Sequence, residues 1–158
     1  MTWKFKSGQN AAQDSIRKAK ITALATTAAI ALCGHLENGD AIQPLNDVSH
    51  ITFGDEAFAQ QGASLKYTGS GLLLTKSFTA SWAVLHEILF GSYQDEGNVP
   101  ASVAGGAAIA ACAYVIDYHI VPKRLTPGFE THLSKRSLLA IYVVLALALG
   151  FGGLRRKT

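Results

Sequence analysis

Charged residues are scarce in this 158-residue chain, at 16% of the sequence against roughly 25% in soluble domains. Cysteine is rarer still: only Cys33 and Cys112 occur, and they form no CxxC pair. This spacing argues against metal or redox chemistry through sulfur. Both cysteines lie within apolar segments at different expected depths, so we expect two packing side chains and no disulfide.

Recognisable catalytic motifs are also missing. The sequence contains no glycine-rich phosphate loop, no nucleophile elbow and no pair of carboxylates at catalytic spacing. His86 and Glu87 resemble half of a zinc-protease motif, but Phe90 stands where the second histidine is required. We therefore expect no enzymatic activity and no cofactor.

The sequence contains four apolar segments with few charged residues. Each is near the length of about 20 residues with which a helix crosses a bilayer. The sequence predicts an all-α fold, in which residues 1–158 form a single domain, an integral membrane four-helix bundle. The predicted spans cover residues 20–36, 65–90, 101–121 and 137–154.

The connections between the spans differ in length and charge. The first, residues 37–71, has 35 residues and is too long for an inert turn, so we expect it to be structured. Residues 1–20 are interpreted as a basic arm at the membrane surface. Lys and Arg number eight at the two ends of the chain against five in the connections of the other side, which predicts cytoplasmic N- and C-termini.

The two connections of the outer side carry opposite charge. Residues 37–71 are acidic and residues 122–136 are basic. Because both must lie on the same side of a four-span bundle, we expect surface ion pairs between them. The expected partners are Asp55 or Glu56 on one connection and Arg124, Lys135 or Arg136 on the other.

Five polar residues within the predicted spans are singled out as candidate site residues: Lys76, His86, Glu87, Asp117 and His119. Lys76 and Asp117 are expected at similar depths on neighbouring antiparallel helices, where an ion pair would offset two charges that are costly in hydrocarbon. We favour such inter-helix clamps. The alternative is that Lys76, Glu87 and Asp117 bind or relay ions in a transporter.

Four histidines, His35, His50, His119 and His132, are expected on the outer side. Together with nearby aspartates they supply enough nitrogen and oxygen for a metal site, and His35 with His119 for a haem. None forms a histidine pair at helical spacing, so the sequence leaves metal and haem binding open.

Three segments carry a family resemblance: NDVSHITFGDEAFAQQGASLKYTGSGLLL, SWAVLHEILFG and YVIDYHIVPKRLTPGFETHLSKRSLLAIY. Over residues 46–142 the chain resembles a family of small four-span bacterial inner-membrane proteins with no established activity. The resemblance implies a multi-pass protein of the bacterial inner membrane, and it implies no site.

Small residues on the first and third spans and a uniformly apolar fourth span are typical of helices that dock against other helices. The sequence therefore predicts a protein that acts by interaction, as an accessory or assembly subunit of a larger membrane complex or as a homo-oligomer. Its expected partners are the lipid bilayer and other membrane subunits or further copies of itself, with no nucleic acid. The alternative is a small transporter or ion-conducting oligomer.

Overall fold

The chain forms a helical bundle. The structure, a computed structural model, describes residues 9–153, and this part of the chain contains helices and no strand. The long helices are α1 (Gln9–Asn38), α4 (Ser70–Asp95), α5 (Val99–Val115) and α6 (Lys135–Phe151). Shorter elements are α2 (Gln43–Asp47), α3 (His50–Phe53), the π-helices η2 (Leu65–Gly69) and η3 (Ile116–Ile120), and the 3₁₀ turns η1 (Gly54–Ala59), η4 (Lys123–Leu125) and η5 (Phe129–Thr131).

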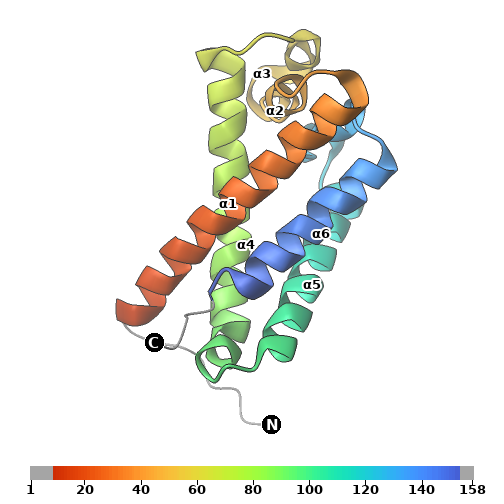
Figure 1. Ribbon diagram of the computed structural model, residues 1–158. Coiled ribbons are helices and arrows are strands. Elements are labelled where there is room, and N and C mark those ends of the chain that lie inside the picture. The colour runs from red at the N-terminus through yellow and green to blue at the C-terminus, as the bar shows by residue number, and fades with distance from the viewer. Residues whose placement is uncertain (1–8, 154–158) are drawn as a thin grey trace.

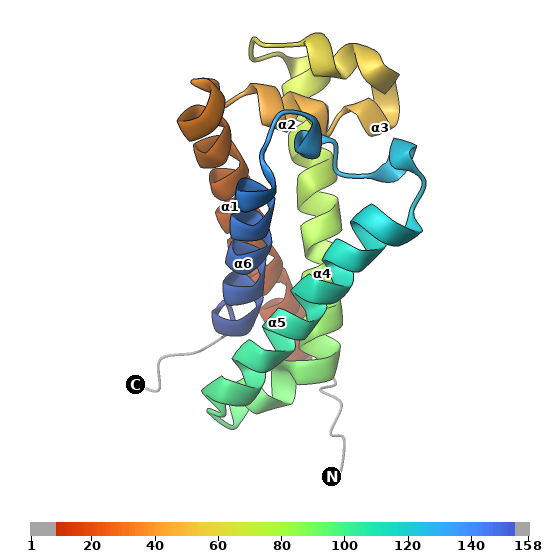
Figure 2. The same ribbon diagram turned by 90° about the vertical axis from the view of Figure 1, so that its right-hand side faces the viewer.

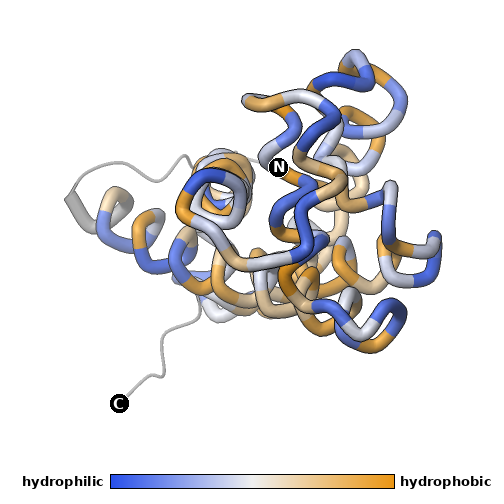
Figure 3. Tube along the Cα trace, turned by 90° about the horizontal axis from the view of Figure 1, so that it is seen from above, coloured by the Kyte–Doolittle hydropathy of each residue, from blue (hydrophilic) through white to orange (hydrophobic). Residues whose placement is uncertain are grey.

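The two longer connections lie at the same end of the bundle. Figures 1 and 2 show α2, α3 and the segment before α6 above the long helices, with the short turn between α4 and α5 at the opposite end. We call residues 39–69 and 121–134 the head, and its end of the bundle the head end. Seen from that end (Figure 3), these connections carry both hydrophilic and apolar positions. The sequence prediction that the two connections share one side is confirmed.

Helix α1 is longer than the predicted first span. It runs without interruption for 30 residues from Gln9, so the basic segment from there onward belongs to the bundle and is not a surface arm. Residues 1–8 lie outside the described part. The basic segment joins the bundle because a buried stripe at four-residue spacing continues from it into the apolar segment. The stripe consists of Asp14, Lys18, Thr22, Thr26 and Ile30.

Helix α6, and α5 together with η3, begin and end close to their predicted limits, whereas α4 runs to Asp95, past its predicted end at residue 90. Ser64 caps η2, because its hydroxyl accepts a hydrogen bond from the backbone N–H of Tyr67 at 3.1 Å, and η2 leads directly into α4. By length and apolar composition, two helical segments of the described chain are able to cross a membrane, Ala12–Asn38 and Val99–Ile120. This is weak evidence for a membrane location, since buried helices of soluble proteins have the same properties.

Helices α5 and α6 touch through their backbones. A Cβ atom on Gly106 would lie 2.3 Å from the carbonyl oxygen of Ala146, so only glycine fits at this position. Near the same crossing, the hydroxyl of Ser102 donates to the carbonyl oxygen of Gly150 at 2.8 Å. Small residues thus set the spacing of these two helices.

The head is fastened by polar contacts between its two connections and the ends of the long helices. Nδ1 of His132 lies 2.9 Å from Oδ2 of Asp47, which is fully buried. The amide of Asn38 donates to the carbonyl oxygen of His132 at 2.6 Å, and Glu37 accepts from the backbone N–H of Ser134 at 2.8 Å.

The expected surface ion pairs between the connections are not formed. Glu56 binds Lys66 of its own connection at 2.9 Å and accepts a hydrogen bond from the hydroxyl of Tyr67 at 3.0 Å. No ion pair within residues 9–153 joins Asp55 or Glu56 to Arg124, Lys135 or Arg136. The connections dock instead through the part-buried contact of His132 with Asp47, because exposed pairs contribute only about 0 to 1 kcal/mol and do not fix a geometry.

Buried Asp47 makes the stability of the head depend on pH. Burial raises the pKa of this carboxyl from 3.8 to about 7; the contact with His132 opposes the rise, and Glu130 and Asp40 add to it. The folded state therefore holds a proton that the unfolded state releases between pH 4 and pH 7. Stability should be fully present near pH 4 and decline as pH rises to about 7, by on the order of 3 to 4 kcal/mol.

Thermal unfolding of the purified protein in detergent from pH 4 to pH 8 measures this decline. Asp47→Asn removes the titrating group, so its melting temperature should vary much less over this range. Asp55→Asn, at an exposed position of the same connection, should keep the wild-type slope. An equal slope in the Asp47 variant and the wild type would assign the dependence to another group.

Candidate functional site

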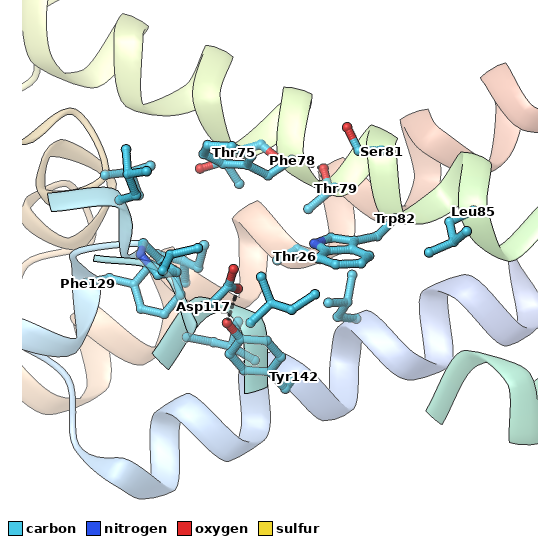
Figure 4. A pocket seen from close by; sticks show the side chains of 18 residues that line it. Thr26, Thr75, Phe78, Thr79, Ser81, Trp82, Leu85, Asp117, Phe129 and Tyr142 are labelled. Carbon is cyan, nitrogen blue, oxygen red and sulfur yellow. Dashed lines mark hydrogen bonds between the residues drawn. The ribbon is translucent and has the colours of Figure 1, made fainter. Parts of the chain in front are cut away.

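A cavity of about 400 Å³ lies between the long helices near the head end. Its walls come from α1 (Thr26), α4 (Thr79 and Trp82) and α6 (Tyr142), and Phe129 of the head covers its end. Figure 4 shows side chains of α4 facing Asp117 and Tyr142 across this space. The lining is predominantly apolar with a few polar groups, and the volume of the cavity falls within the range of small-molecule sites.

The polar end of the cavity is formed by Asp117 and Tyr142. The hydroxyl of Tyr142 donates to Oδ2 of Asp117 at 2.5 Å (Figure 4). Asp117 is half-buried, and no lysine, arginine or histidine of residues 9–153 lines the cavity. The carboxyl group thus meets a neutral hydroxyl in an otherwise apolar wall.

The predicted ion pair between Lys76 and Asp117 is not formed. Lys76 is exposed, does not line the cavity and makes no ion pair with Asp117. The prediction assumed that α4 and α5 stay in contact along their whole length. They separate toward the head end, where the cavity lies between α4 and η3, so the two side chains have no common interface.

The cavity opens on the flank of the bundle. Two lining residues from different elements are about half exposed, Phe78 of α4 at 46% and Leu125 of η4 at 49%, and Ser81 of α4 is also exposed. Deeper in, the hydroxyl of Thr26 is buried and has no hydrogen-bond partner within the described residues. The site therefore combines a side opening, an acidic end and one unused hydroxyl.

A second polar cluster lies nearer the turn between α4 and α5. Lys18 is fully buried and forms an ion pair with Glu87, and its Nζ lies 3.0 Å from Nδ1 of His86. Nε2 of His86 lies 3.1 Å from the carbonyl oxygen of Ser102. Because lysine only donates and a carbonyl only accepts, His86 carries its hydrogen on Nε2 and is neutral. This cluster clamps α1, α4 and α5 together.

The outer histidines do not gather into one site. His35 and His119 are exposed, and the ring of His119 packs 5.7 Å from that of Tyr114. His50 lies 2.9 Å from the carbonyl oxygen of Asp47, and His132 contacts the carboxylate of the same residue. Within residues 9–153, no three His, Cys, Asp or Glu side chains are grouped to hold a metal ion.

Of the five polar residues singled out in the sequence, the structure joins only His86 and Glu87, and it joins them through Lys18. Sequence reasoning missed Lys18 and Tyr142, the actual partners of Glu87 and Asp117. The four-residue spacing of Asp14, Lys18 and Thr22 was the available signal for Lys18. Tyr142 was visible as the only ionisable group of the last span.

Comparisons of the chain with family models, curated proteins and solved structures found no match. The family resemblance of residues 46–142 therefore stays a prediction.

Proposed function

We propose that this chain is a four-span protein of the bacterial inner membrane, with both termini in the cytoplasm, that acts by interaction with other membrane helices. Support for the spans comes from large apolar side chains that are exposed on all four long helices. Soluble proteins rarely expose so much contiguous apolar surface. Examples are Leu24 and Leu32 of α1, Leu73 and Ile88 of α4, Val115 of α5, and Leu139 and Leu147 of α6.

The polar residues of α4 are compatible with a span because few of them would meet lipid with an unpaired polar group. Thr75, Thr79, His86 and Glu87 are all buried against other helices. Ser77 and Ser81 are exposed, but their hydroxyls donate to backbone carbonyl oxygens of the same helix. Lys76 is exposed near the head end, where its long side chain can reach the headgroup region. The mean hydropathy of α4 is thus lowered in part by residues that would not meet lipid.

The observation that carries the interaction is the free face of α5. Five small residues on this helix are exposed at spacings of three and four, which leaves a smooth stripe that no other described segment covers. Small residues at this spacing let a second transmembrane helix approach closely. They are Ala104, Ala107, Ala108, Ala111 and Cys112. We propose that this stripe docks another subunit of a membrane complex or a second copy of the chain.

A bulky side chain on this stripe should block docking without unfolding the bundle. Ala108→Leu is expected to dissociate the complex that the wild-type protein forms after gentle solubilisation, as measured by native mass spectrometry. Ala140→Leu, the same change at an exposed position of α6, serves as the matched control and should leave the complex intact. Retention of the wild-type mass by the Ala108 variant would exclude the α5 face.

Cys112 tells a homo-oligomer from a hetero-complex. In a Cys33→Ala background, oxidation of membranes should link two copies through Cys112 if the stripe pairs with itself. A hetero-complex should give a stable larger mass without this dimer. Monomers under both conditions would overturn the proposal.

A transporter is the second candidate, because the cavity places Asp117 at the end of an apolar chamber. Glu87, in contrast, is held by Lys18 within a buried clamp. Flux in liposomes that is lost in Asp117→Asn would favour the transporter. A stable complex without flux would favour the accessory subunit.

A further inference from the structure

The cavity near the head end lies apart from the α5 stripe and supports a separate proposal about a ligand. This proposal rests on the proposed function only for the membrane location. Three observations bear on its occupant: the direction of its opening, the chemistry of its wall and the charge at its end.

The opening indicates a lipophilic occupant. Phe78, Ser81 and Leu125 border the cavity and are exposed on the flank of the bundle, beside the outward apolar faces of the helices. In a four-span arrangement this flank faces the bilayer, so a molecule dissolved in lipid reaches the cavity without crossing water. About 400 Å³ accommodates a compact organic molecule.

The acidic group at the end of the cavity determines which charge the ligand carries. Among residues 9–153, the ionisable groups in the lining are Asp117 and Tyr142, and the carboxylate accepts one hydrogen bond from the tyrosine hydroxyl. Glu130 interacts with Asp117 as a second acid, which adds negative potential. No cation from the described part of the chain lines the cavity.

The aromatic side chains in the wall of the cavity also favour a cationic ligand. Phe78, Trp82 and Tyr142 bring aromatic rings to the cavity (Figure 4), and such rings attract a cation within about 6 Å of their faces. The buried hydroxyl of Thr26 has no partner in residues 9–153 and is available to an N–H donor. A carboxylate, aromatic rings and a free acceptor together match a protonated amine.

We propose that the cavity binds a lipophilic amine in its protonated form, with the ammonium group at Asp117 and the apolar body between α4 and α6. Asp117 supplies the charge, Tyr142 orients its carboxylate, and the apolar wall excludes water.

The test compares 1-adamantylamine with 1-adamantanol, two rigid probes that share their apolar body and differ in the ammonium group. Trp3→Phe leaves Trp82 as the only tryptophan, so its fluorescence in lipid nanodiscs reports binding at the cavity wall. The amine should bind roughly tenfold more tightly than the alcohol, as expected for a charge-assisted hydrogen bond.

Asp117→Asn keeps an acceptor for Tyr142 but removes the charge. It should abolish the preference for the amine while changing the affinity for the alcohol less than about twofold, and the alcohol thereby shows that the variant is folded. Asp55→Asn, the same change at an exposed site outside the cavity, should keep the preference. Ser81→Phe places a bulky side chain at the opening and should weaken the binding of both probes.

Equal affinity for the two probes would overturn the proposal and identify the cavity as a site for neutral amphiphiles. Persistence of the amine preference in Asp117→Asn, or absence of binding by both probes, would overturn it too. None of these outcomes involves the α5 stripe. If the cavity proposal is overturned, the proposal that the α5 stripe docks a partner is therefore unaffected and is tested separately.

Discussion

Lys18→Met should be the most damaging single substitution in the helices, with an expected loss of about 3 to 5 kcal/mol in the free energy of unfolding. Lys18 is fully buried and forms the ion pair with Glu87 that joins α1 to α4. Methionine has a similar length, so the change removes the cation beside Glu87 and the donor to His86 while leaving the packing nearly unchanged. Denaturant unfolding in mixed micelles measures the loss.

Lys20→Met is the matched control, because Lys20 is exposed on the same helix two residues away. It should change the free energy of unfolding by less than about 0.5 kcal/mol. Adding Glu87→Met to Lys18→Met should recover part of the stability, since removal of both charges is often nearly neutral. A double variant no more stable than Lys18→Met would show that the clamp contributes by shape and not by charge.

Gly71→Ala should detach the head from the bundle. A Cβ atom at Gly71 would lie 2.0 Å from the carbonyl oxygen of Leu45, so α4 and α2 must move apart to accept even one methyl group. Because the obstacle is backbone, we expect a loss of about 3 kcal/mol, the upper part of the range for overpacking. Faster amide hydrogen exchange in α2 and α3, with little change in α5 and α6, would show where the loss falls.

Gly69→Ala supplies the control for this prediction. Gly69 is helical and two residues earlier, but a Cβ atom there meets only the end of the Leu65 side chain, at 3.2 Å. Alanine should be neutral or stabilising by up to about 1 kcal/mol, because it restricts the unfolded chain. A similar loss in both variants would mean that helix propensity and not the contact with Leu45 decides the outcome.

The helices and their order were predictable because they depend on local patterns. Apolar segments near spanning length predicted the four long helices. The placement of the two long connections at one end follows from the order of the helices alone. The continuous α1 was missed because charge was used as the boundary, although the four-residue stripe through Lys18 continues past it.

The pairing of polar residues was not predictable from depth. Lys76 and Asp117 were expected at comparable depths, yet which side of a helix meets a neighbour depends on how the helices diverge. The stripe of α4 that is buried at Glu87 is exposed at Lys76, and the adjoining face with Thr75 and Thr79 lines the cavity between α4 and η3. A cavity is a deficit of side-chain volume between elements far apart in sequence, and no local pattern records it.

In the proposed membrane location, the unequal lengths of the helices have a consequence for the surrounding lipid. The helical segment of α1 that contains its apolar window has 27 residues, about 40 Å, whereas α6 has 17, about 25 Å, and the hydrocarbon core is about 30 Å thick. In a bilayer α1, which is inclined to α4 in Figure 1, tilts or extends beyond the hydrocarbon at its charged end, and the bilayer beside α6 must thin. Such hydrophobic mismatch costs fractions of a kcal/mol per Å around the exposed perimeter. A partner helix that covers the short side removes that deformation, so membrane thickness itself becomes a determinant of assembly.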